Sequence, residues 1–293
     1  RAGSRDPVGN TWWVSTQAGQ YTAVDTRGVL PPDDEPPDER VEVHDLVGVI
    51  EIPDVHEMDS RPGLEPLPAI HRGAVDAGEQ AGKIATAGTG APVLVSSAIN
   101  GKPAVRFDGV DDFLNLPGGF QNFTGGLTLF IVQRPAVLQS GYKLFMLGNG
   151  AGLLNIGLGR AGTTAGYRYF TTNTVGAFES FDTNDGVLAG EASLIALRQQ
   201  PGTADALSYA EVFKNGNALA GRNVYVPPVA VRTLNHIGQS HFSDGLFQGD
   251  IAEILLYNRI LTPSEQDAVQ AYISQKYGFT LGSMPPPPLL PRP

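Results

Sequence analysis

Carboxylates are the first side chains in this sequence that could do chemistry. Two of them on one strand, in an E-x-D-x-x-E pattern, would share a cleft and cleave a glycosidic bond as acid and nucleophile. Glu57 and Asp59 begin that pattern, but Pro62 stands where the last glutamate is needed. Asp250 and Glu253 are three residues apart, so a regular strand would send them to opposite faces. We therefore expect loop and edge charges here, and we predict that the protein is not an enzyme.

Clustered side-chain oxygens are candidates for a metal site, because calcium takes several oxygen ligands from one loop. Asp182, Asn184 and Asp185 offer three such oxygens next to Gly186. A second acidic cluster is Asp108, Asp111 and Asp112. Neither set has EF-hand spacing, and Asp and Asn more often serve as turn residues that bond their own backbone. Asp182, Asn184 and Asp185 are the better metal candidate, and no cofactor other than calcium is expected.

Sugar recognition would need exposed aromatic rings beside planar hydrogen-bonding groups. Tyr167, Arg168 and Tyr169 lie on one β-prone segment, with the two tyrosines on the same face and Arg168 on the other. If the tyrosines face a concave surface they form a stacking platform, and if they face inward they belong to the core. We take the three residues as the ligand-binding candidates. For the two tyrosines we favour the alternative, a place in the core.

The composition excludes several classes of partner and of site. The net charge is −10, which disfavours nucleic acid, whose phosphates require a basic surface, and an anionic membrane surface. No apolar run reaches membrane-spanning length, so no membrane insertion is expected. The chain has no cysteine, which excludes disulfides and thiolate metal sites. The 36 glycines and 23 prolines favour many short strands joined by tight turns.

The elements that would position these groups are short strands. From residue 92 onward, alternating or apolar runs predict strands near 93–95, 104–107, 113–116, 127–133, 143–147, 154–157, 167–171, 192–198, 208–220, 235–238 and 251–257. Asn215-Gly216 lies between two β-prone runs and predicts a tight hairpin. One helix follows: Thr262-Pro-Ser-Glu265 is a capping box, and Gly278 supplies a left-handed stop.

Three further segments are not expected to form regular secondary structure. Residues 1–10 are polar and predict an N-terminal arm. Residues 53–79 are rich in proline, glycine and charge and predict an irregular insertion. Residues 283–293 form a proline-rich tail that has no means of folding alone. We expect one domain, an all-β two-sheet antiparallel jelly-roll sandwich over residues 11–282 with one C-terminal helix and extended terminal arms.

The motifs N-G-K-P-A-V-R-F-D-G-V-D-D-F-L-N-L from Asn100, V-F-K-N-G-N-A-L from Val212 and F-Q-G-D-I-A-E-I-L-L-Y-N-R-I-L-T-P-S-E from Phe247 occur in this order. In them the sequence resembles the laminin-G-like jelly-roll domains, of bacterial and phage type, in the concanavalin-A-like lectin/glucanase superfamily. The resemblance implies two packed antiparallel sheets that bind carbohydrate or protein. Fold alone does not fix the ligand.

We therefore predict a non-catalytic binding or adhesion protein, located extracellularly or on a virion surface. The first hypothesis is a structural or glycan-recognising, receptor-binding subunit of a large assembly, such as a phage tail tip, fibre or capsid decoration. Its partners would be protein subunits contacted through both termini, together with a cell-surface glycan. The alternative is a stand-alone carbohydrate-binding module of a bacterial secreted protein, and an atypical glycoside hydrolase is the second alternative.

Overall fold

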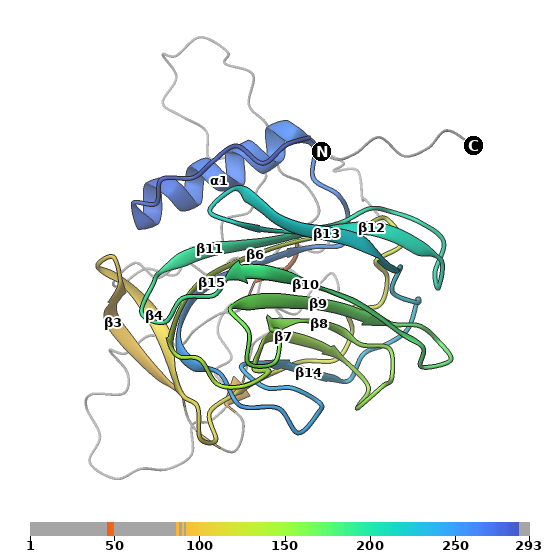
Figure 1. Ribbon diagram of the computed structural model, residues 1–293, viewed down its shortest axis with the longest axis horizontal. Coiled ribbons are helices and arrows are strands. Elements are labelled where there is room, and N and C mark those ends of the chain that lie inside the picture. Colours follow the sequence, from red (N-terminus) through yellow and green to blue (C-terminus); the bar gives the residue numbers. More distant parts are fainter. Residues whose placement is uncertain (1–45, 50–85, 88–89, 91, 287–293) are drawn as a thin grey trace, which may run out of the picture.

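Two antiparallel sheets lie face to face in the computed structural model, which describes residues 46–49, 86–87, 90 and 92–286 (Figure 1). The eight-stranded sheet has the order β13 (Asn217–Tyr225), β12 (Leu207–Lys214), β11 (Ser193–Gln199), β6 (Leu127–Val137), β15 (Gln248–Tyr257), β4 (Lys102–Asp108) and β3 (Val93–Ile99), and β1 (Leu46–Val49) also pairs with β15. The seven-stranded sheet has the order β10 (Phe178–Gly186), β9 (Gly166–Thr172), β8 (Ile156–Arg160), β7 (Lys143–Gly148), β14 (Leu234–Ile237), β5 (Leu114–Leu116) and β2 (Thr86–Ala87). The predicted jelly-roll sandwich is confirmed.

Alternation along the central strand β6 shows how the sequence builds two cores. Leu129 and Ile131 point between the sheets and join the main core. Phe130 and Val132 point to the other side of the eight-stranded sheet and join a second core there. Both faces of β6 are buried, so its sequence is apolar throughout rather than alternately polar.

The second core is closed by the single helix, α1 (Pro263–Tyr277). Its capping box forms as the sequence predicts, and Gly278 ends it with φ 68°. Val269, Ile273 and Tyr277 are buried against the outer face of the eight-stranded sheet, which contributes about 1.5–3 kcal/mol for each side chain. Figure 1 shows α1 lying across the outer side of that sheet. No helix in the described part of the chain is long and apolar enough to cross a membrane.

The hairpin between β12 and β13 is confirmed at the predicted residues. Asn215 and Gly216 have φ of 49° and 81°, the positive values that a two-residue turn of this kind requires. A Cβ atom on Gly216 would also lie 1.8 Å from the carbonyl oxygen of Gly282, so the C-terminal segment passes close to this turn.

Two predicted segments differ in the structure. The residues 181–186, interpreted as a turn around Gly186, belong to strand β10, which pairs with β9. The first residues of the predicted tail pack on the domain itself, since Met284 is 3% exposed and lies in the second core. The N-terminal arm, the 53–79 insertion and residues 287–293 lie outside the described residues.

Candidate functional site

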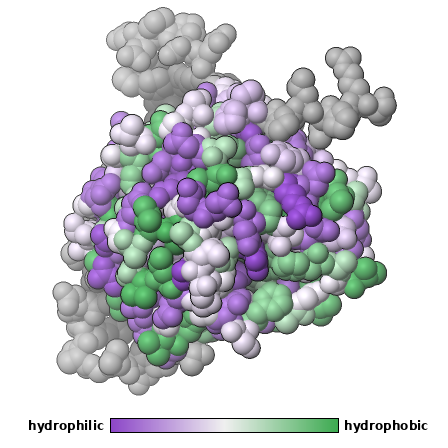
Figure 2. Space-filling view, in the orientation of Figure 1, coloured by the Kyte–Doolittle hydropathy of each residue, from purple (hydrophilic) through white to green (hydrophobic). Residues whose placement is uncertain are grey.

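The two outer faces of the sandwich differ in what covers them. α1 and the segment after it cover the outer face of the eight-stranded sheet. The loop between β14 and β15 packs on the outer face of the seven-stranded sheet, where its Phe242 contacts Phe170 of β9. On the face of the molecule that Figure 2 shows, hydrophilic and hydrophobic residues are mixed. The outer face of the seven-stranded sheet is therefore the sheet surface that α1 leaves uncovered.

Three phenylalanine rings gather on this outer face, and we call them the aromatic platform: Phe170, Phe178 and Phe242. Phe170 and Phe178 stack with ring centroids 5.2 Å apart and planes at 30°, while Phe242 meets Phe170 edge to face at 6.1 Å. Phe170 is 1% exposed, whereas Phe178 and Phe242 are 48% and 37% exposed. The buried ring thus supports two rings whose surfaces reach solvent.

Glycines in β8 allow the neighbouring strands to pack closely beneath the aromatic platform. A Cβ atom on Gly157 would lie 2.2 Å from the ring of Phe170 and 2.9 Å from the sulfur of Met146. A Cβ atom on Gly159 would lie 2.0 Å from the carbonyl oxygen of Tyr142. At Gly157 the side chains of Phe170 and Met146 lie over β8, and at Gly159 the backbone of the neighbouring strand approaches closely, so a Cβ atom would clash at either position.

Two ion pairs border the platform. Arg168 donates from Nε and Nη2 to the two carboxylate oxygens of Asp182, at 2.6 and 2.7 Å. Lys143 donates to Asp244 at 2.8 Å, and its Nζ lies 5.9 Å from the centre of the Phe170 ring. The hydrogen bond to Asp182 raises the pKa of Arg168, and burial lowers the pKa of Lys143. The pairs fix planar and charged hydrogen-bonding groups beside the rings.

A pair of histidines lies on the same face of the sheet. The rings of His236 and His241 meet edge to face with centroids 5.3 Å apart, and Phe113 packs on His236 at 5.5 Å. His241 Nδ1 lies 3.1 Å from Oδ1 of Asn155. Burial, and then the neighbouring His241, lowers the pKa of His236 to about 4. Burial also lowers the pKa of His241, so both rings are neutral at pH 7.

The predicted ligand-binding residues divide between the core and this face. Tyr167 and Tyr169 are 0% exposed, between the sheets, and their hydroxyls bond to Gln133 and Gln199. Burial raises the pKa of both tyrosines. Both tyrosines therefore take the favoured alternative, a place in the core, and they form no stacking platform, because the alternation of β9 turns them inward. Arg168, between them, lies on the opposite face, as the alternation predicts, and its side chain reaches the outer surface.

The predicted metal candidates lie on β10 rather than in a turn. Asp182 is held by the two hydrogen bonds from Arg168. Thr183 is buried, and its hydroxyl donates to the carbonyl oxygen of Asp185. Asn184 is exposed. The expected arrangement of three oxygens around Gly186 is replaced by a strand in which the first carboxylate already has a cationic partner.

The second acidic cluster does come together, with carboxylate oxygens of Asp108, Asp111 and Asp112 within 4.8 Å of one another. Asp108 Oδ1 accepts from the backbone N–H of Val110 at 2.8 Å, and Asp112 Oδ2 accepts from the N–H of Asp108 at 2.8 Å. Burial raises the pKa of Asp112. These bonds tie the turn after β4, which is the turn role weighed above for these residues.

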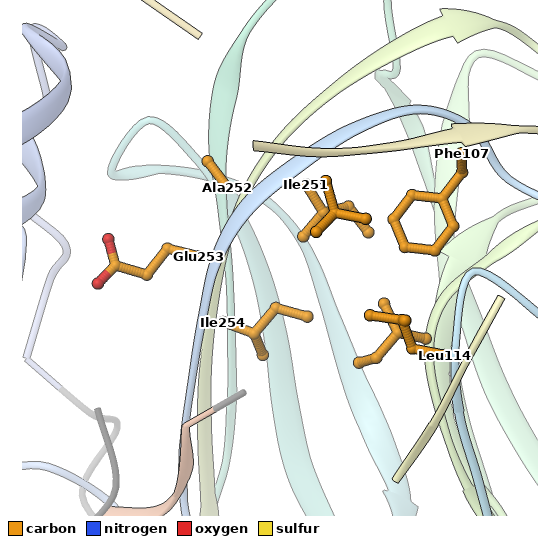
Figure 3. Close-up of a pocket in the computed structure, with 8 residues that line it drawn as sticks. Phe107, Leu114, Ile251, Ala252, Glu253 and Ile254 are labelled. Atoms are coloured by element: carbon orange, nitrogen blue, oxygen red, sulfur yellow. The ribbon is translucent and has the colours of Figure 1, made fainter. Parts of the chain in front are cut away.

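Asp250 and Glu253 lie on the same face of β15, contrary to the prediction. A register irregularity between Ile251 and Glu253 adds a residue, so Glu253 points the same way as Ala252, away from the apolar pocket at Phe107 (Figure 3). Both carboxylates have cationic partners. Arg106 and Arg134 bond Asp250 at 2.7 and 2.5 Å.

Glu253 accepts from Tyr272 at 2.8 Å and from Lys276 at 3.1 Å. It is 2% exposed beneath α1, and burial raises its pKa. The sites of Glu57 and Asp59 lie outside the described residues. Neither described carboxylate of β15 is therefore placed as a free acid or nucleophile facing a substrate.

Phe178 and Phe242 are the residues that the sequence interpretation missed. In β10, Phe178, Ser180 and Asp182 alternate with the inward Phe181 and Thr183. That period of two is visible in the sequence and would have predicted a strand with an outward phenylalanine and aspartate. Phe242 lies in a loop, and no local pattern brings it to Phe170.

Comparison with known proteins finds structural likeness only. No protein-family model matches the chain, and no curated protein matches it. The binding domain of botulinum neurotoxin serotype D superposes with a TM-score of 0.49 and 9% identity, over 65% of this chain and 47% of that one. Domain 4 of AbnA, a GH43 extracellular arabinanase from Geobacillus stearothermophilus in complex with arabinotriose, gives 0.44 and 18%, over 60% and 79%.

The sialidase CBM40 of Ruminococcus gnavus bound to α2,3-sialyllactose gives a TM-score of 0.41 and 16% identity, over 56% of this chain and 97% of that one. Every one of these scores lies below 0.5, so the likenesses carry no functional inference for this chain.

Proposed function

We propose that this domain is a non-catalytic carbohydrate-binding module, and that its binding surface is the aromatic platform together with Arg168 and Asp182. The observation that carries the proposal is the position of Phe178 and Phe242, which are partly exposed among the described residues, on the outer face of the seven-stranded sheet beside a bidentate ion pair. Apolar surfaces that carry a few placed polar groups are typical of small-molecule sites.

The chemistry of a sugar matches this surface. The C–H face of a sugar ring is apolar and packs on an aromatic ring, while its hydroxyls both donate and accept hydrogen bonds. Arg168 offers N–H donors and Asp182 offers acceptors, and each is about two-fifths exposed in its side chain, at 41% and 39%. Their geometry is set before a ligand arrives, which reduces the entropy lost on binding.

A location outside the cell, on a secreted or virion-borne protein, is the setting we infer for such a module. The N-terminal residues and residues 287–293, which would contact other subunits of an assembly, lie outside the described residues. The adhesion role in a tail tip, fibre or capsid therefore stays a prediction from the sequence.

Glycan-array binding with the full chain, followed by calorimetry on the best oligosaccharide, tests the proposal. Phe178→Ala and Phe242→Ala should each weaken binding about ten-fold, the loss of roughly 1.4 kcal/mol expected for one stacking contact. Leu188→Ala is the matched control, since Leu188 is 56% exposed but is not part of the platform. Absence of binding to any glycan, or platform variants that bind like the wild type, would overturn the proposal.

A further inference from the structure

Four charged side chains border the aromatic platform, and they form two pairs of opposite sign. Arg168 is bonded to Asp182 and Lys143 to Asp244. The two pairs are neighbours, because Lys143 of β7 and Arg168 of β9 both lie opposite Gly159 of β8, which has no side chain between them. Asp244 accordingly raises the pKa of Arg168, and Arg168 lowers that of Lys143. The border therefore carries two cations and two anions that interact as one network.

The network has no net charge at neutral pH. The four side chains cancel, and His236 and His241, on the same sheet face, are neutral because burial lowers the pKa of each. Each cation already has its carboxylate: the Nε and Nη2 groups of Arg168 point at Asp182, and Lys143 is 6% exposed in its side chain. A ligand meets donors and acceptors here, but no uncompensated cation in this network.

An acidic sugar is poorly matched to such a border. Its carboxylate would accept from Arg168 but would lie next to the carboxylate of Asp182, and like charges brought together in this way disfavour a partner. A hydroxyl group can donate to Asp182 and accept from Arg168 at the same time. The chain's net charge of −10 adds a weak, long-range repulsion of anions.

From this network we infer that the platform selects neutral glycans over glycans that carry a carboxylate, such as sialylated or uronic-acid sugars. This inference rests on the proposed function, and it names the class of sugar for the same surface.

The test is a comparison of matched oligosaccharides that differ only in the acidic group, for example lactose with 3′-sialyllactose and a neutral glucan oligomer with its uronic-acid counterpart. Calorimetry with the full chain at pH 7 should show the neutral member of a bound pair binding at least ten-fold more tightly. Equal or tighter binding of the acidic member would overturn the inference and leave the proposed function standing. Failure of both members, across the array as well, would overturn the proposed function and the inference with it.

A charge variant separates specificity from folding. Asp182→Asn removes the carboxylate that Arg168 bonds and leaves the four-residue network with one excess positive charge, so the ratio of acidic to neutral affinity should rise at least five-fold. Asp267→Asn is the control, because Asp267 is exposed on α1 and its substitution changes the net charge by the same amount on the far side of the sandwich. An unchanged ratio in Asp182→Asn, or an equal rise in both variants, would overturn the inference.

Discussion

The ring of Phe170 lies directly over Gly157, at 2.2 Å from where a Cβ atom of that glycine would stand. Phe170 in turn supports Phe178 and Phe242, so a glycine on the neighbouring strand sets the height of the whole platform. Gly157→Ala should push Phe170 outward and spread the two exposed rings. We expect glycan affinity to fall at least ten-fold in calorimetry while the far-ultraviolet circular dichroism keeps its β-sheet form.

The control for this substitution is Gly118→Ala. A Cβ atom on Gly118 meets only the carbonyl oxygen of Arg232 at 3.7 Å, which is an ordinary contact. Gly118→Ala should bind like the wild type. Wild-type affinity in Gly157→Ala would show that the ring of Phe170 does not position the binding surface.

Acid should weaken the fold through the histidine pair. His236 has a pKa of about 4 in the folded protein and 6.5 when exposed, so the unfolded chain binds the proton more readily. The stability from the neutral ring is complete above pH 6.5 and is lost progressively as the pH falls toward 4. Thermal melting between pH 7.5 and 4.5 should therefore show a melting temperature that falls below pH 6.5.

Substitution of His236 tests whether this residue causes the fall in melting temperature with pH. His236→Phe keeps an aromatic ring beside Phe113 and His241 but cannot take up a proton. Its melting temperature should fall less between pH 6.5 and 4.5 than that of the wild type. Identical slopes in the two proteins would assign the acid sensitivity to other groups.

The elements of the fold could be read from the sequence because their signals are local. Asn215-Gly216 predicts its hairpin through the positive φ that both residues adopt, and Thr262 with Glu265 predicts the start of α1 through a capping box that forms. The strands of both sheets from β3 onward follow from short apolar runs. The exception is β10. Its residues Asp182, Asn184 and Asp185 are of types that favour turns, and β10 can contain them because it is an edge strand with one face exposed to solvent.

The candidate site could be predicted only in part, because it depends on contacts between distant segments. Arg168 was found from the alternation of β9, but which side faced outward was not fixed, and Tyr167 and Tyr169 lie in the core. Phe242 contacts Phe170 although 72 positions separate them along the chain. The bulge that turns Glu253 toward α1 is also a tertiary feature, since a regular alternation predicts the opposite face.

Asp250 should contribute more to stability than an exposed carboxylate. It is 2% exposed and is bonded by Arg106 and Arg134, whose own side chains are 47% and 32% exposed. Asp250→Asn removes a buried charge from between two cations, so we expect the free energy of unfolding to fall by about 1–3 kcal/mol, less than a fully buried pair would lose. Urea denaturation measures this loss.

Asp182→Asn provides the comparison for Asp250, since it breaks an equally well-formed but exposed pair and should cost about 1 kcal/mol or less. Equal losses in the two variants would show that burial of Asp250 adds nothing to the strength of its ion pairs.

The segment after α1 should behave as part of the domain, although its sequence reads as the start of a proline-rich tail. Met284 is 3% exposed in the second core, and Arg198 donates to the carbonyl oxygen of Pro285 at 2.8 Å. Met284→Ala should lower the free energy of unfolding by about 2–3 kcal/mol, since it leaves a cavity beside the eight-stranded sheet. Ser283→Ala, at an exposed position, should cost less than about 0.5 kcal/mol. If urea denaturation gives the same midpoint for both variants, the domain ends before Ser283, as the sequence predicts.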